Sequence, residues 1–195
     1  PTVPQLQGVL ASLSAQNKEW PIAMSAYREA VRFSRHSCFQ TDDFYFGLVG
    51  ALLSRVDSSS SPDAIEAEAE AIRVLEDVVG AFPGEALIQF KSRLLAAMVY
   101  RLTGSAARAD LAAQNAFDLF CNLQLTEQAE WIDPMMDGLE GSEVEAEAQA
   151  LRQQINRDMS RLDWGKLNIQ GMLCYRKKEY RKALGVFVRA DGLLP

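Results

Sequence analysis

The stretch WGKLNIQGMLCYRKKEYRKALGVFVRADGLLP, residues 164–195, contains two short helical patterns separated by a tight turn. Two helices can approach closely only where their facing residues are small, and Gly171 and Ala183 meet that requirement. Bulkier side chains have to fill the remaining space, and Leu167, Tyr180 and Phe187 have the spacing to do so. The stretch therefore predicts a helical hairpin.

The same spacing occurs near the start of the chain. There, Leu6, Leu10 and Leu13 form one face of a predicted helix, and Pro21 is well placed to begin a second one. Four positions of the second helix match four of the C-terminal hairpin: Trp20, Ala23, Tyr27 and Ala30 correspond to Tyr180, Ala183, Phe187 and Ala190. Residues 4–37 are therefore predicted to form a first repeat.

Two further repeats follow. Thr41 is expected to cap a helix, and Ser61 a second one, on either side of a serine-rich loop that lengthens the unit of residues 41–83. Residues 85–121 form the next unit, in which the turn at residues 103–105 separates an amphipathic helix from one with regularly spaced small residues. Those small residues are Ala109, Ala113 and Ala116.

The region from residue 125 to residue 162 fits the pattern least well. Thr126 is expected to cap a short helix, which Asp133-Pro134 and Gly138 interrupt. Ser142 and Glu145 have the spacing of a capping box, which predicts a helix that continues to about Leu162. This unit is a degenerate repeat.

The matched positions resemble those of the tetratricopeptide repeat, a helical hairpin of about 34 residues. The resemblance is specific over residues 164–195, weaker over 4–35 and 85–121, and weakest elsewhere. It implies an all-α fold, a right-handed αα-superhelix of about five helix pairs in one domain, residues 1–195. The approximate units are residues 4–37, 41–83, 85–121, 125–162 and 163–195.

Proteins of this family are typically scaffolds or adaptors that hold a partner segment in a groove lined by the first helix of each pair. The resemblance places the following residues in that groove: Lys91, Leu94, Met98, Arg101, Asn168, Met172 and Tyr175, with Gln5, Ser12 and Ala15 in the first unit. This mixed surface suits a protein or peptide partner, amphipathic and with some acidic character. Gly8 and Ser12, like Leu94 and Met98, replace the Lys and Asn of the family's chaperone-tail clamp, so that activity is not expected.

The amino-acid composition limits the class of partner and the cellular compartment that we expect. The net charge of -6 and the pI of about 4.9 argue against a nucleic-acid binder. Three widely spaced cysteines, Cys38, Cys121 and Cys174, favour a reducing, cytoplasmic setting, and Cys121 and Cys174 are expected in the core. The sequence shows no apolar run long enough to span a membrane and no secretory signal. Because the chain opens on Pro1, we expect it to be a fragment or a processed product.

No pattern in the sequence indicates catalysis, a cofactor or a metal. The acidic residues around Asp133 and Glu143 hint at a calcium loop, but Met135 and Val144 occupy two of the places that need oxygen ligands. His36 and Cys38 are neighbours that would point to different faces of a helix. We therefore expect no enzyme activity and no cofactor.

Two charged features have two interpretations each. A basic cluster, Arg176, Lys177, Lys178, Arg181 and Lys182, is either the solvated turn of a hairpin or a contact for an acidic partner. The acidic tracts of residues 66–70 and 140–147 are either solvated helix faces or contacts for a basic partner.

Two functions remain open. The first is a protein-interaction scaffold that binds a partner segment in its groove. The second is a structural subunit that packs through its terminal repeat faces, including self-association. Leu184, Phe187 and Val188 of the last helix would supply such an interface, because no polar capping helix follows them in this sequence.

Overall fold

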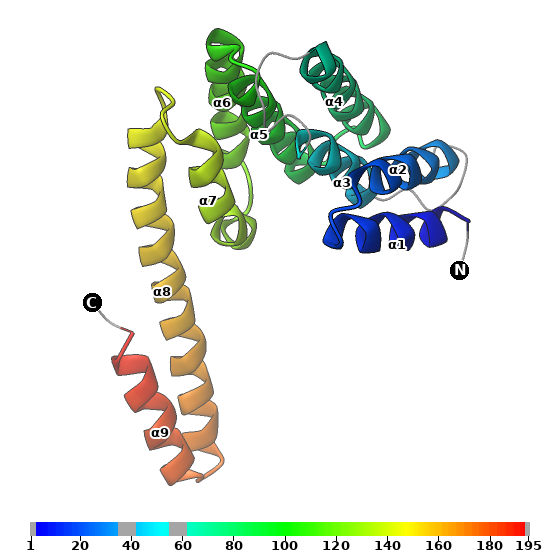
Figure 1. Ribbon diagram of the computed structural model, residues 1–195. Helices are drawn as coiled ribbons and strands as arrows, with labels where there is room; N and C mark the ends of the chain where they lie inside the picture. The colour runs from blue at the N-terminus through cyan, green and yellow to red at the C-terminus, as the bar shows by residue number, and fades with distance from the viewer. Residues whose placement is uncertain (1–2, 35–41, 55–61, 194–195) are drawn as a thin grey trace. The chain divides into compact units, whose positions relative to one another are not determined.

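The computed structural model describes residues 3–34, 42–54 and 62–193. Within these residues the chain forms nine α-helices and no strands, so the expected all-α class is confirmed (Figure 1). The helices are α1 Val3–Gln16, α2 Trp20–Ser34, α3 Asp42–Leu53, α4 Pro62–Ala81, α5 Ala86–Leu102, α6 Ala106–Cys121, α7 Leu125–Leu139, α8 Glu145–Arg176 and α9 Tyr180–Asp191. The expected caps Thr41 and Ser61, the serine-rich loop, His36, Cys38 and Pro195 lie outside the described residues.

The helices form two compact units. The first comprises Pro1–Leu123 with Pro134–Glu145, and the second comprises Gln124–Asp133 with Ala146–Pro195. In the first unit, α1 packs on α2, α3 on α4 and α5 on α6, and α2–α3 and α4–α5 also make contact. The second unit contains the α8–α9 hairpin. None of the helices in the described part of the chain is long and apolar enough to cross a bilayer.

Three hairpins have the same turn geometry. The turns after α1, α5 and α8 each contain one residue in the left-handed region: Lys18 (φ 61°), Gly104 (φ 79°) and Lys178 (φ 63°). In each turn this residue donates to a carbonyl three residues back, and the next amide donates to one five residues back, as in Glu179 N–H to Cys174 at 3.0 Å. This is the Schellman arrangement that satisfies the last carbonyls of a helix. The predicted turn at residues 103–105 and the tight turn predicted within residues 164–195 are confirmed.

Small residues line the interior of the same three hairpins. On the first helices, Ala11, Ala97 and Gly171 are buried at equivalent distances before the turn. On the second helices, the buried equivalents are Ala23, Ala109 and Ala183, followed by Ala30, Ala116 and Ala190. A Cβ on Gly171 would lie 2.5 Å from the Phe187 ring, which explains why this position has no side chain. The close approach predicted for Gly171 and Ala183 is therefore confirmed.

One of the three expected filling residues differs from the prediction. Phe187 and Leu167 are half-buried, whereas Tyr180 is 58% exposed and packs edge-on against Tyr175 at the surface, with ring centroids 5.5 Å apart. The expectation that Tyr180 fills the hairpin is wrong. It begins α9 directly after the turn, where its side chain lies at the end of the interface.

The core of the first unit is centred on aromatic side chains. Phe90 of α5 and Phe120 of α6 are both fully buried, with ring centroids 5.2 Å apart. Tyr45 of α3 is 1% exposed and packs edge-on against Phe82, at 6.4 Å. The large rings of Phe90 and Phe120 fill the space between α5 and α6 that the small buried residues of these helices leave.

The leucines of α1 lie on the outside of the fold. Its buried residues are the small or compact ones, Pro4, Gly8, Ala11 and Ser14. Leu6, Leu10 and Leu13 share a face as predicted, but that face is about half exposed. A Cβ on Gly8 would collide with the Phe44 ring. At this contact α3 therefore supplies the large side chain, and the glycine of α1 leaves room for it.

Helix α7 is longer than the sequence predicts. It runs without a break through Asp133, Pro134 and Gly138, so the expected interruption is wrong. Pro134 removes one backbone hydrogen-bond donor, but the helical turns on either side of it remain intact. At Gly138, the side chain of Leu94 occupies the space beside the glycine. The helix also begins before the expected cap Thr126: Glu127 accepts the Gln124 N–H at 3.0 Å, as in half of a capping box.

Helix α8 extends well beyond its predicted end. The expected stop near Leu162 is wrong, because the helix continues to Arg176. A single glycine within a helix, such as Gly165, costs about 1 kcal/mol relative to alanine. That cost is too small to end the helix unless a residue at positive φ also begins a turn there. The boundary between units 125–162 and 163–195 therefore lies inside one helix.

The start of α8 is stabilised differently from the predicted capping box. The Ser142 hydroxyl donates to the Leu139 carbonyl at 2.6 Å, and the Glu145 carboxylate accepts from the Gly141 N–H at 2.7 Å. Gly141 has a φ of 72° and lies in the turn that precedes the helix. The helix start is predicted correctly, but Glu145 reaches one residue further back than the motif requires.

One ion pair joins the first and second hairpins. Arg28 of α2 donates through Nε and Nη2 to both carboxylate oxygens of Glu70 in α4, each at 2.6 Å. This hydrogen bond raises the pKa of Arg28, with a further contribution from the charges of Glu70 and Glu66. A raised pKa on a base adds stability below that pKa, so the contribution is constant across neutral pH and is lost only in strong alkali.

We expect Arg28→Met to lower the free energy of unfolding by about 0.5–1 kcal/mol, because the pair is bidentate but partly exposed. Urea unfolding at low and high salt would measure it, and the loss should shrink in 1 M NaCl. The control is Arg32→Met, since Arg32 pairs with Glu29 within the same helix. An equal loss in both variants would contradict a bridging role for Arg28.

Candidate interaction surfaces

Two of the predicted groove residues on α5 are engaged inside the first unit. Leu94 is 4% exposed and lies against Gly138. Lys91 pairs with Asp42 at 3.7 Å, and its Nζ lies 5.8 Å from the centre of the Phe46 ring. Met98 and Arg101 are half-buried. These four residues lie on one side of α5. Of the four, only Met98 and Arg101 remain substantially exposed and make no contact like those of Leu94 and Lys91.

The remaining groove predictions lie at the two ends of the chain. In α8, Met172 and Tyr175 are about half exposed and Asn168 is half-buried. In α1, Gln5 is exposed, Ala15 is half-buried, and the Ser12 hydroxyl lies 3.4 Å from the Tyr27 hydroxyl of α2. These residues lie in separate units, and each set is a small surface in its own right.

A cleft of about 430 Å³ lies between α4, α5 and α6, within the first unit. Its apolar lining comes from all three helices, and its polar lining includes two arginines. The lining includes Ile72, Leu75, Val79, Glu76, Arg93, Ala96, Tyr100, Arg108 and Leu111. Most of the residues of α5 that line it, Arg93, Ala96 and Tyr100 among them, belong to a different side of that helix from the predicted groove.

The lining of the cleft carries charge on all three helices: Glu76 of α4, Arg93 of α5 and Arg108 of α6. Arg108 lies over the Tyr100 ring, with its Cζ 5.8 Å from the ring centre, and pairs with Glu68 of α4 at 3.6 Å. Arg108 keeps 69% of its side chain exposed, whereas Glu68 keeps 17%. Leu111 is 65% exposed at the edge of the cleft. The arrangement offers an apolar surface with a guanidinium that stacking holds in place.

The sequence contained a signal for this cleft that the hairpin pattern does not use. Helix α4 has half-buried apolar residues at positions 72 and 79 in addition to those packed at 71, 74, 75 and 78. Its apolar face is therefore broader than one partner helix can cover. An isolated Leu111 among the alanines of α6 is the matching signal on the opposite wall.

The predicted terminal interface is partly committed to the hairpin itself. Leu184 and Val188 of α9 are 65% and 64% exposed, whereas Phe187 is half-buried against Gly171. A shallow groove lies beside them between α8 and α9, lined by residues that include Lys166, Leu167 and Val188. Leu184 and Val188 therefore remain available on the surface, and Phe187 fastens α9 to α8.

The charged features of the sequence are solvated or paired. All five cations of the basic cluster are exposed, and Lys182 pairs with Glu179 at 3.2 Å in the same turn. In the acidic tract of α4, Glu70 pairs with Arg28 and Glu68 with Arg108. Cys174 is half-buried, but Cys121 is exposed at the end of α6, so the expectation that Cys121 belongs to the core is wrong.

In the part of the chain that the structure describes, no three His, Cys, Asp or Glu side chains gather as metal ligands would. The surfaces described above are apolar patches edged by charge. No protein-family model, no curated protein and no solved structure matches this chain.

Proposed function

We propose that this chain is a non-catalytic protein-interaction module built from tetratricopeptide-like hairpins. The support is the recurrence of one turn geometry and one set of small buried residues in α1–α2, α5–α6 and α8–α9. In this proposal α1–α6 stack as a right-handed superhelix that presents grooves between neighbouring hairpins. The proposal includes a reducing, cytoplasmic setting, which rests on the few and widely spaced cysteines.

The cleft between α4, α5 and α6 is the observation that carries the proposal. Its volume of about 430 Å³ accommodates a few side chains of a partner rather than a whole helix. Ile72, Val79 and Leu111 suit apolar anchors at helical spacing, and Arg108 suits a carboxylate beside them. The partner that fits is an amphipathic segment with an acidic residue at the edge of its apolar face.

Site-specific photocrosslinking tests this binding mode. A photoreactive phenylalanine analogue placed at position 111 should capture a partner in cells, because Leu111 borders the cleft and is 65% exposed. The matched control is the same analogue at position 114, since Gln114 is also exposed on α6 but does not line the cleft. Adding Arg108→Glu should reduce capture from position 111 about tenfold, as expected for loss of a charged contact worth 1.4 kcal/mol or more.

Equal capture from positions 111 and 114, or capture that Arg108→Glu leaves unchanged, would contradict the cleft as the binding site. Circular dichroism should show the same helix content in all variants. Both positions lie on the solvent side of α6, so the substitutions leave its buried alanines intact.

A second candidate function is that of a structural subunit in a larger assembly, and the outer face of α1 favours it. Five aliphatic side chains on this helix are about half exposed or more: Val3, Leu6, Val9, Leu10 and Leu13. A permanent neighbour would cover such a face. In that case, a crosslinker at Val9 would capture the same protein with the same yield, whether or not the chain carries Arg108→Glu in the cleft.

A further inference from the structure

Helix α8 carries a second apolar seam on the side away from α9. Its residues recur at alternating intervals of four and three, which is the spacing of a coiled-coil interface. They are Asp158, Leu162, Gly165, Ile169, Met172 and Arg176. This seam is distinct from the hairpin contact, which uses Gly171 and Leu167 on the opposite side of the helix.

The seam is open. Leu162, Ile169 and Met172 are 39%, 65% and 45% exposed, and Leu173 beside them is 52% exposed. A Cβ on Gly165 would meet no atom within 4 Å. In contrast, Gly171 is buried beneath Phe187. An α-helix this long needs only one apolar face to hold α9, so the second face is available for another contact.

The order of residues along the seam is self-complementary. An acid begins it and a base ends it, and three larger apolar residues and a glycine lie between Asp158 and Arg176. When one copy is reversed against another about the level of Leu167, each residue meets a suitable partner. Asp158 meets Arg176 of the partner subunit, Leu162 meets Met172 of the partner subunit, and Gly165 meets Ile169 of the partner subunit.

We propose that two copies of this chain associate through an antiparallel pairing of their α8 helices along this seam. A contact of this kind is isologous and closed, so it produces a dimer rather than a filament. Ile169 fills the space above the glycine of the other copy, and the two Asp–Arg pairs close the ends. A parallel pairing would instead place like charges together and leave the two glycines facing each other.

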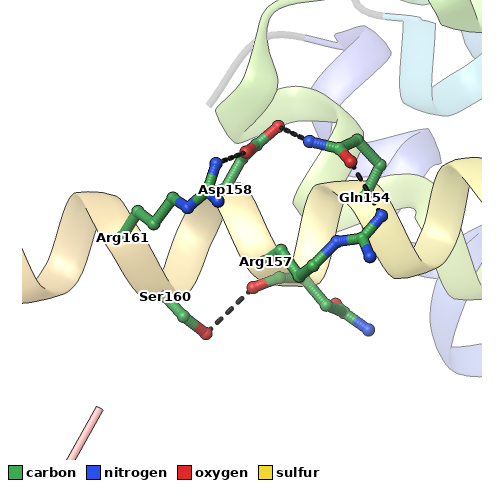
Figure 2. A network of polar contacts seen from close by, with 6 residues as sticks. Gln154, Arg157, Asp158, Ser160 and Arg161 are labelled. Atoms are coloured by element: carbon green, nitrogen blue, oxygen red, sulfur yellow. Dashed lines mark hydrogen bonds and ion pairs between the residues drawn. The ribbon is translucent and has the colours of Figure 1, made fainter. Parts of the chain in front are cut away.

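Local contacts already hold the acidic end in place. The Asp158 carboxylate accepts from Gln154 Nε2 at 2.8 Å and pairs with Arg161 at 3.5 Å, while Arg157 donates to Gln154 Oε1 (Figure 2). This network restrains the side chain before association, which lowers the entropic cost of a further ion pair. The seam spans about 27 Å of helix, at 1.5 Å per residue. That length places the interface at the small end of specific complexes, so we expect dissociation in the micromolar range.

Sedimentation equilibrium of the full chain tests the dimer. Wild type should show a concentration-dependent monomer–dimer equilibrium, and Ile169→Asp should weaken it at least tenfold. The control is Leu184→Asp, because Leu184 has the same 65% exposure on α9 but lies outside the seam. A monomer at all concentrations, or equal weakening by both variants, would overturn the proposal.

Charge reversal and crosslinking test the direction of pairing. Asp158→Arg and Arg176→Asp should each weaken the dimer several-fold, and combining them should restore it. In a background without native cysteines, Leu162→Cys and Met172→Cys chains should form a disulfide with each other when mixed. Linkage of each variant mainly to itself would indicate a parallel pair and overturn the antiparallel assignment.

Discussion

Phe120→Ala should lower the free energy of unfolding of the first unit by about 3–5 kcal/mol, the range typical of phenylalanine truncation in a core. Phe120 is fully buried and packs on Phe90 of the neighbouring helix at 5.2 Å. The alanines that surround it on α6 are too small to fill the cavity, so little relaxation can recover the lost contacts. Urea unfolding followed by circular dichroism would measure the change.

The control for this prediction is Phe33→Ala. Phe33 is 37% exposed, and the guanidinium of Arg32 lies 4.9 Å from its ring centre. A loss of less than about 1 kcal/mol is expected there, as for an exposed cation–π pair. If the two truncations cost the same, the Phe90–Phe120 contact is not the centre of the core.

Two glycines of α8 should respond to alanine with opposite signs. Gly171→Ala should destabilise the α8–α9 hairpin by about 1–3 kcal/mol, because the added methyl group would lie 2.5 Å from the Phe187 ring. Gly165→Ala should stabilise the helix by up to about 1 kcal/mol, since its Cβ would enter open space and alanine is the better helix former. Both changes are conservative and lie within the same helix.

Hydrogen exchange of the α9 amides would measure the difference, at a chain concentration below that of dimer formation. Exchange should be faster in Gly171→Ala than in wild type and no faster in Gly165→Ala. Equal protection in both variants would mean that Phe187 moves aside and that the close approach of α8 and α9 is not required.

The hairpins could be predicted from the sequence because their determinants are local. Small residues at fixed distances from a polar turn dictate close packing, and Ala23, Ala109 and Ala183 are all buried where the spacing requires. The turns follow from the same pattern. These features depend on a few neighbouring residues, so a single sequence is enough to find them.

Features that depend on competition between contacts could not be predicted in the same way. The leucines of α1 have the spacing of a core face, but the Phe44 ring occupies the space beside Gly8, and the leucines remain outside. Pro134 and Gly165 are residues that often end helices, yet neither does so here. Whether a helix stops depends on the free energy of the alternative turn, which no single residue reveals.

The candidate surfaces were the least predictable part. Leu94 belongs to the predicted groove by register, but the absence of a side chain at Gly138 lets it become core. The cleft depends on the breadth of the apolar face of α4 and on one leucine of α6. Both signals are visible in the sequence, but their meaning requires knowing that α4, α5 and α6 are neighbours.

The three matching turns have a consequence for how such a chain can diverge. Their residues are Asn-Lys-Glu, Thr-Gly-Ser and Lys-Lys-Glu, although the backbone hydrogen bonds are the same. Each amide bonds to a carbonyl whatever side chain its residue carries, so selection can alter charge and polarity at these tips while the chain reverses direction in the same way. The same reversal of the chain is thus compatible with different residues in the turn, including both Gly104 and Lys178 at the position of positive φ.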